Sequence, residues 1–168
     1  MIEPMQTMLD ELQQETTTTR RLLEPVPGDK LAWKPHRKSM SLGQLALHVA
    51  RIPGDLARLA ELDGFDAAQA NFDPASPNSV NEVLTALDAS LGVAEKYLHR
   101  ISEKKAAGTW RLTLRGKEVF TIPRPGLLRS LMLNHWYHHR GQLSVYLRLL
   151  DVPLPVIYGR SADENPFV

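Results

Sequence analysis

The chain has 168 residues, of which 43% are hydrophobic and 23% are charged, and its formal net charge is +1. This size suits one domain with its own core, which we expect to span residues 1–168. The 20 basic and 19 acidic residues are mixed in order, without the basic patch that is typical of a nucleic-acid-binding protein. The lack of cysteine excludes disulfides, Cys-based zinc sites and a cysteine nucleophile, and it fits a reducing cytoplasm.

Targeting signals are missing from the sequence. Residues 1–6 lack the basic and apolar regions of a signal peptide, and no apolar stretch is long enough to span a bilayer. We therefore expect a cytoplasmic protein that binds neither membranes nor nucleic acid.

Two segments in the first half of the chain are predicted to be helices. Residues 3–24 carry apolar side chains at helical spacing. A second helix begins at Ser41, whose side chain can form a capping box with Gln44. The apolar stripe of this helix includes His48. Pro53 should kink the helix about one turn later, because proline removes a backbone hydrogen bond.

The second half of the chain predicts two more helices, separated by an extended excursion. Residues 63–78 should form a long loop, and Ser79-Val-Asn-Glu82 is a second capping box that opens the third helix. Residues 106–122 indicate a short pair of strands around a polar turn. The fourth helix should span residues 123–151, with an inner face formed by Leu128, Leu131, Met132, His135, His139, Gln142, Tyr146 and Leu149. This pattern predicts an all-α protein, a four-helix bundle with a short extended excursion between its third and fourth helices.

Three histidines fall on the predicted inner faces of two different helices. His135 and His139 are four residues apart, which places their Cβ atoms about 6 Å apart on one helix face, and His48 belongs to the second helix. A single histidine on an apolar stripe is more often a core residue bonded to a carbonyl. Burying three imidazoles is costly unless their donors and acceptors find partners, and one divalent cation would bind three acceptors at once. The sequence therefore predicts a metal site formed by His48, His135 and His139, for which Zn²⁺ or Ni²⁺ is suitable.

The residues around this site exclude two familiar kinds of metal chemistry. Trp136 occupies the position at which His-Glu-x-x-His metalloproteases carry their general base, and the chain lacks the Glu-x-x-His pairs of di-iron bundles. The open coordination position could hold a water of lowered pKa or a substrate thiol. Gln142 could bond a ligand there as a substrate-binding residue, or serve as a capping or core amide. The catalytic residues are not identified.

Further predictions concern the neighbours of the histidines. Trp136 and Tyr137 should pack against another helix or a subunit, Arg140 should be a structural ion-pair donor, and Gly141 could allow a close helix approach. The remaining histidines are expected in solvent, one of them in a loop with three basic residues: His138, His99, and His36 beside Lys34, Arg37 and Lys38.

Two motifs and one histidine resemble a known family. The segment Asn134-His-x-x-His-His-Arg-Gly-Gln142, the upstream His48 and the tail from Val152 to Glu164 look like the DinB-like family of the DinB/YfiT-like metalloenzymes. This is the damage-inducible group, not the DNA polymerase of similar name. The resemblance covers essentially the whole chain, although Arg160 stands where the family's tail usually has proline.

The resemblance implies a four-helix bundle, commonly a homodimer, with a divalent metal held by three histidines. By position, these correspond to His48, His135 and His139. Some relatives transfer or isomerise groups with low-molecular-weight thiols such as bacillithiol or mycothiol. We therefore expect a metal-dependent enzyme, a thiol-dependent S-transferase or a hydrolase, linked to the stress or DNA-damage response. The alternative is a non-catalytic metal-binding stress protein, which the lack of an obvious general base favours.

Overall fold

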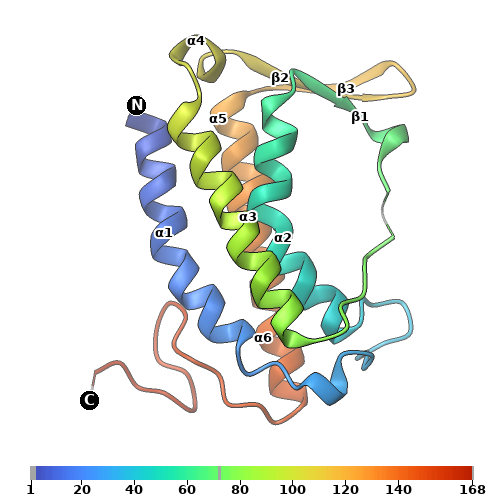
Figure 1. The fold of residues 1–168 in the computed structure, drawn as a ribbon, viewed down its shortest axis with the longest axis vertical. Coiled ribbons are helices and arrows are strands. Elements are labelled where there is room, and N and C mark those ends of the chain that lie inside the picture. Colours follow the sequence, from blue (N-terminus) through green and yellow to red (C-terminus); the bar gives the residue numbers. More distant parts are fainter. Residues whose placement is uncertain (1–2, 72, 168) are drawn as a thin grey trace.

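Long helices dominate the computed structural model, which describes residues 3–71 and 73–167 (Figure 1). Residues 1, 2, 72 and 168 of the predicted domain lie outside the described residues. Helices α1, α2 and α3 lie side by side, and the last helical run packs behind them against α2 and α1. The bounds are α1 Glu3–Leu23, α2 Leu42–Glu61, α3 Val80–Arg100, α4 Glu103–Ala106, α5 Arg124–Leu127, the π-helical η3 Leu128–Asn134, and α6 His135–Leu149. Short 3₁₀ turns are η1 Gly28–Lys30 and η2 Ala67–Gln69.

A small sheet lies at one end of the helices, so the prediction of an all-α protein is wrong in this detail. The predicted pair of strands is confirmed as β2, Thr109–Leu114, and β3, Lys117–Pro123, which are antiparallel. A third strand, β1, Gly64–Asp66, lies inside the segment that was predicted to be a loop. It pairs in parallel with β2. A strand of three residues is too short to show an alternating pattern in the sequence.

Asp66 ties β1 to the hairpin. Its carboxylate accepts hydrogen bonds from the backbone N–H groups of Arg115 and Gly116 in the β2–β3 turn and from the Thr113 hydroxyl. The turn requires positive φ at both Arg115 and Gly116, a conformation that glycine adopts readily. The backbone N–H groups of Gly116, Ala68 and Arg115 lower the pKa of Asp66 to about 2, since they stabilise the charged carboxylate.

The two predicted capping boxes have different outcomes. At α2, the Ser41 hydroxyl accepts from the Gln44 N–H and the Gln44 side chain accepts from the Ser41 N–H, as predicted. At α3, Ser79 caps the Glu82 N–H, but the Glu82 carboxylate accepts from Asn78 instead of Ser79. The helix still begins at the predicted position, because the Ser79 cap alone satisfies one of its orphan N–H groups.

The predicted inner face of the fourth helix is confirmed at Leu128 and Met132 and is wrong by about one position from residue 133 onwards. The fully buried stripe is formed by Leu128, Met132, Leu133, Trp136, Arg140, Leu143 and Leu147, whereas Leu149 is exposed. The reason is the π-helical segment η3, whose wider turns advance the buried face with a four-residue spacing. His135 and His139 consequently lie beside the core stripe and are half-buried.

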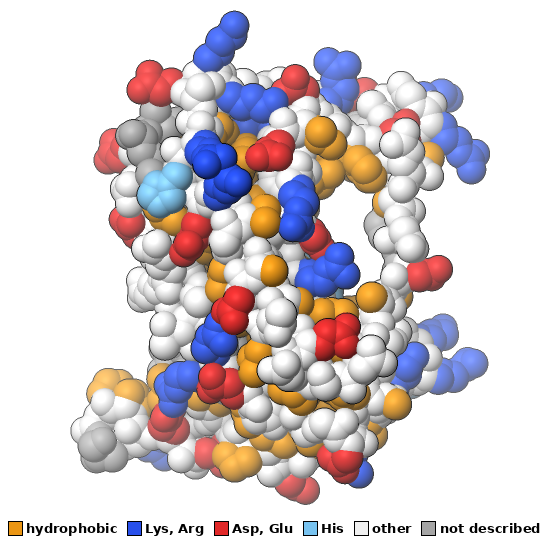
Figure 2. Space-filling model, viewed as in Figure 1, with side chains coloured by type: hydrophobic (Ala, Val, Ile, Leu, Met, Phe, Trp, Pro, Cys, Tyr) orange, Lys and Arg blue, Asp and Glu red, His pale blue; other side chains and the backbone are white. Residues whose placement is uncertain are grey.

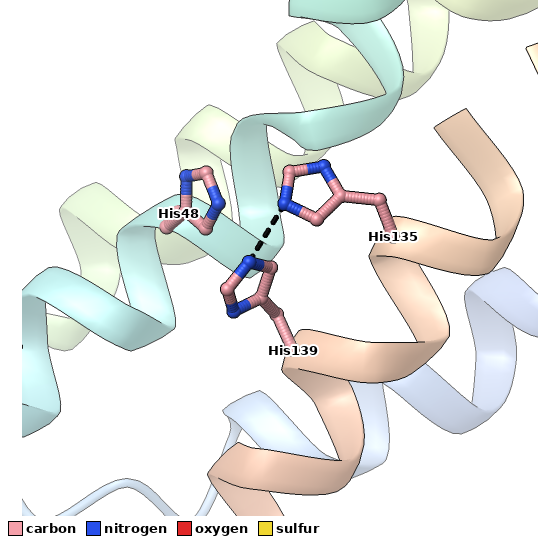
Figure 3. A group of neighbouring side chains, drawn as sticks. All are labelled: His48, His135 and His139. Carbon is pink, nitrogen blue, oxygen red and sulfur yellow. Dashed lines mark hydrogen bonds between the residues drawn. The ribbon is translucent and has the colours of Figure 1, made fainter. Parts of the chain in front are cut away.

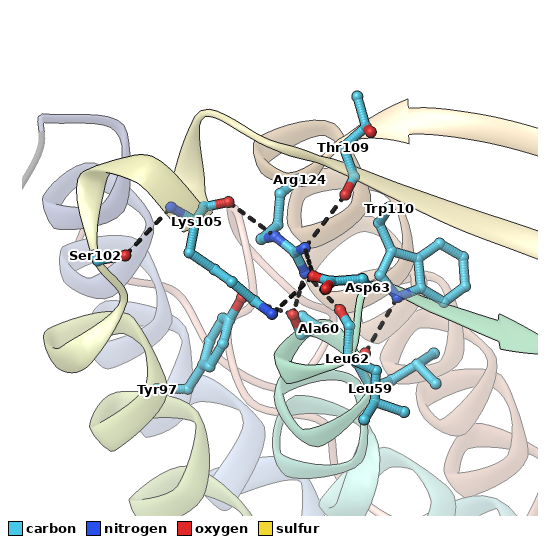
Figure 4. Close-up of polar contacts among 10 residues, drawn as sticks. All are labelled: Leu59, Ala60, Leu62, Asp63, Tyr97, Ser102, Lys105, Thr109, Trp110 and Arg124. Carbon is cyan, nitrogen blue, oxygen red and sulfur yellow. Dashed lines mark hydrogen bonds and ion pairs between the residues drawn. The ribbon is translucent and has the colours of Figure 1, made fainter.

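Arg124 joins the end of α2 to the sheet (Figure 4). Its buried guanidinium donates to the backbone carbonyls of Ala60, Leu62 and Thr109, and it pairs with Asp63 at 3.0 Å. The last carbonyls of a helix lack partners within the helix, so one arginine completes the C-terminus of α2. Across residues 3–71 and 73–167, no helix has the length and apolar character needed to cross a bilayer.

We predict that Arg124→Met lowers the free energy of unfolding by about 3 kcal/mol, because several buried carbonyls lose their donor. Asp63→Asn should cost much less, since this carboxylate is mostly exposed and its ion pairs are screened by solvent. Urea denaturation of both variants measures the difference. Equal losses would show that the surface ion pair, and not the carbonyl contacts, stabilises this junction.

Candidate metal centre

A single hydrogen bond fixes α6 against α2 next to the candidate site. Pro53 has no N–H, so the carbonyl of Val49, four residues earlier, has no partner within α2. The buried indole Nε1 of Trp136 donates to this carbonyl at 2.9 Å. Val49 follows His48, and Trp136 follows His135, so the bond holds two of the candidate ligands in register.

The structure brings the three predicted histidines together (Figure 3). His48 extends from α2, and His135 and His139 extend from α6. Each ring offers one nitrogen, and these nitrogens all lie within 4.8 Å of one another. The rings are 4.4 to 5.3 Å apart between centroids, and all three side chains are half-buried. Side chains 87 positions apart in the sequence thus meet at one point, as a shared metal ion would require.

A hydrogen bond orients one of the rings. Nδ1 of His139 donates to Oε1 of Gln142 at 2.8 Å. An imidazole that donates from Nδ1 carries its lone pair on Nε2. The Nε2 atom of His139 therefore presents a lone pair to the centre of the cluster, the tautomer that metal-ligating histidines adopt.

The Nε2 atoms of His135 and His139 are only 2.7 Å apart. Since Nε2 of His139 is an acceptor in this tautomer, His135 donates to it in this contact, and a cation would take the place of the shared proton. A tetrahedral zinc with bonds of about 2.0–2.1 Å would separate two imidazole nitrogens by about 3.3 Å. These two rings would need to open by only a fraction of an ångström, and His48, whose nitrogen lies within 4.8 Å of theirs, would need to move closer. With these small shifts the donor set fits a divalent cation of the size of Zn²⁺ or Ni²⁺.

Burial keeps these imidazoles neutral. Desolvation lowers the pKa of His48 and of His139 from 6.5 to about 4 in each case, and it also lowers the pKa of His135. Neighbouring rings act in the same direction, because a second positive charge in the cluster is unfavourable. At neutral pH all three nitrogens are consequently free to bind a cation.

The other residues singled out in the sequence have clear positions. Trp136 packs against α2 within the chain, the Tyr137 hydroxyl donates to Glu11 of α1, and Gln142 contacts the His139 ring. A side chain at Gly141 would meet no atom within 4 Å, so the idea of a close helix approach there is wrong within this chain. The histidines that were expected in solvent are exposed, namely His36, His99 and His138.

Arg140 is a buried ion-pair donor, as predicted. Its guanidinium lies 2.5 Å from the Glu15 carboxylate of α1 and donates to the Thr19 hydroxyl, also on α1, and to the Tyr158 hydroxyl of the tail. The tail has no regular structure but is anchored further along by Asp163, which pairs with Arg148 of α6. These contacts hold α6 against α1 and the tail; the identity of these partners was not predicted from the sequence.

Comparisons with known proteins agree on one family. The sequence model of the DinB family matches residues 1–165. A DinB-like protein from Bacillus subtilis has a TM-score of 0.68 at 20% identity, covering 92% of this chain and 99% of its own. A DinB-like protein from Bacillus cereus also has a TM-score of 0.68 at 20% identity, covering 90% and 95%. A member of the DinB family from Exiguobacterium sibiricum, described as putative, has a TM-score of 0.64 at 23% identity, covering 93% and 97%. The search of curated proteins finds no match.

We predict that Trp136→Phe destabilises the protein by about 1–3 kcal/mol, because the Val49 carbonyl loses its donor. The variant should also bind Zn²⁺ more weakly, on the order of tenfold, since α6 is no longer held in register with α2. Trp110→Phe is the matched control. It removes an indole bond to the Leu59 carbonyl of α2, away from the histidines, and should leave Zn²⁺ affinity unchanged. Equal loss of affinity in both variants would contradict this role.

We also predict a pH dependence for the metal-free protein. The pKa of His48 and of His139 is lower in the folded state than in the unfolded state, so the unfolded chain takes up protons first as the pH falls. The free energy of unfolding should therefore fall from about pH 6.5 down to about pH 4. Urea denaturation of the wild type and of a His48→Gln/His139→Gln variant measures this. The same slope in both proteins would argue against the histidines as its source.

Proposed function

Because this chain belongs to the DinB family and brings three imidazoles together, we propose that it is a metal-dependent enzyme. One divalent ion, Zn²⁺ or Ni²⁺, is held by His48, His135 and His139. The observation that carries the proposal is the convergence of the three nitrogens within 4.8 Å, with neutral rings at neutral pH. One cation would bind an acceptor nitrogen from each of the three rings at once.

The candidate ligands in the described part of the chain are histidines alone. Three protein ligands leave one coordination position open, as in catalytic zinc sites. When bound, the cation would act as a Lewis acid and lower the pKa of a thiol or a water in that position. The chain contains no cysteine, so the thiol would belong to a substrate.

The protein's own residues hold and orient this centre. Gln142 sets the tautomer of His139, and the Trp136 hydrogen bond holds the α6 histidines next to α2. In this proposal Gln142 acts on His139; a direct contact with substrate remains a prediction. The chemistry is that of a thiol-dependent S-transferase or a hydrolase.

Several finer points of the proposal rest on family membership. They are the arrangement of the long helices as a four-helix bundle, assembly as a homodimer, a low-molecular-weight thiol as co-substrate, a cytoplasmic location and a role in the stress or DNA-damage response.

The first experiment is elemental analysis of tag-free protein, followed by assays of thiol transfer and of ester or thioester hydrolysis. The wild type should contain about one metal ion per chain, and His135→Ala should lose both the metal and turnover. His138→Ala is the matched control, because this neighbouring histidine is exposed and lies outside the cluster. Its metal content and turnover should equal those of the wild type.

Two outcomes would count against an enzyme. Turnover that persists in a metal-free His48→Ala/His135→Ala/His139→Ala variant would separate the activity from the cluster. Metal that raises the melting temperature without supporting any turnover would favour the alternative, a non-catalytic metal-binding stress protein.

A further inference from the structure

A cavity of about 870 Å³ opens beside the histidine cluster, and His48 forms part of its wall. The cavity lies between the outer face of α2, residues 34–40, and the segment that runs from η2 to α3, which contributes residues 71 and 73–75. Figure 2 shows the hollow between this segment and the helices, with Lys and Arg side chains along its border. Its volume is within the range of about 300–1,000 Å³ that is typical of small-molecule sites.

The charge of the cavity differs from that of the rest of the protein. Four basic side chains and two acidic ones line it, a balance of +2: Lys34, Arg37, Lys38 and Arg51 against Asp55 and Asp73. The whole chain has 20 basic and 19 acidic residues, so the remaining 16 and 17 give −1. Positive charge is therefore concentrated at this cavity, and a cation bound by the histidines would add to it.

Among the basic residues that line the cavity, Arg51 is the closest in sequence to His48. It follows His48 by three positions on α2, so the two side chains share a helix face. Its Nε lies 3.4 Å from the Asp55 carboxylate, in an ion pair whose two side chains are about half exposed. Asp55 also pairs with Arg58 at 3.1 Å, so it would keep a partner if Arg51 turned to a ligand.

The other basic residues form a cluster at residues 34–38. Within the described ranges, Lys34, Arg37 and Lys38 form no ion pair. All three side chains are exposed, yet they line the same cavity as His48. Three cations without acidic partners, gathered at one cavity, raise the local concentration of anions.

We infer that this cavity binds a small substrate with a carboxylate or phosphate group, which Arg51 and the Lys34–Arg37–Lys38 cluster hold while the reactive end reaches the histidines. Asp73 lines the opposite wall and disfavours an anion there, which orients the substrate. The inference rests on the proposed function and specifies its substrate class. The volume of about 870 Å³ matches a small molecule.

Cobalt-loaded protein and two simple thiols test this inference. Mercaptopropionate is anionic and mercaptoethanol is neutral, and each gives a thiolate-to-cobalt absorption band when it binds. The chain has no cysteine, so the band reports only the added thiol. The measured quantity is the ratio of the two dissociation constants, in wild type, in Arg51→Gln and in Lys34→Gln/Arg37→Gln/Lys38→Gln. Arg58→Gln is the matched control, because Arg58 pairs with the same carboxylate but does not line the cavity.

We expect the preference for mercaptopropionate to fall about five- to tenfold in the first two variants, with mercaptoethanol affinity unchanged, and to stay constant in Arg58→Gln. An equal ratio in all four cobalt-loaded proteins would overturn the inference and leave the proposed metal site intact. Failure of the wild type to bind cobalt would overturn both. Micromolar binding of a short oligonucleotide that is lost in the triple variant would assign the cluster to nucleic acid and overturn the inference.

Discussion

The contact between the Trp136 indole and the Val49 carbonyl determines where the histidines meet. It exists because Pro53 interrupts the hydrogen bonding of α2 and leaves a buried carbonyl without a donor. An unpaired buried carbonyl is costly, so the packing of α6 on α2 is favoured at the one register that supplies the indole. Pro53 therefore influences how the two helices pack. Two candidate ligands lie one residue before the ends of this hydrogen bond, since His48 precedes Val49 and His135 precedes Trp136.

The interrupted helix is completed by a second side chain from the opposite side. The buried Ser90 hydroxyl of α3 donates to the Arg51 carbonyl and accepts from the Gly54 N–H. The close packing requires glycine at position 54, because a Cβ there would lie 2.8 Å from the Ser90 backbone. Helix α2 is thus held by α6 on one side and α3 on the other, around the proline. This leaves His48, Arg51 and Asp55 as a row on its remaining face, towards the cavity.

The candidate centre balances burial against polarity. The rings are buried enough to stay uncharged at neutral pH, and one of them, His48, also lines a cavity. Neutral rings can converge, since protonated imidazoles would repel one another and any cation. Basic side chains are concentrated around the cavity, and no carboxylate belongs to the candidate metal-binding cluster in the described part of the chain.

The sequence by itself determined what depends on local geometry. The capping residue Ser41 and the helical spacing located α2, and the four-residue interval between His135 and His139 ensured that both rings share a face of α6. The segment around this pair, together with His48 and the tail, also indicated the family. Local rules were insufficient where the backbone departs from ideal geometry: the π-helical segment η3 moved the buried face, and β1 is too short to detect.

Only the tertiary structure decided which distant residues meet. The sequence pattern of α2 does not show which residues of α6 contact this helix. The contact depends on the Val49 carbonyl, which has no donor within α2, and on the packing of Trp136 against it. In the same way, Lys34 and Asp73 are ordinary loop residues in the sequence and become opposite walls of one cavity in the fold. Interactions within a helix extend over about four residues, whereas burial and hydrogen bonding between elements select the long-range pairs.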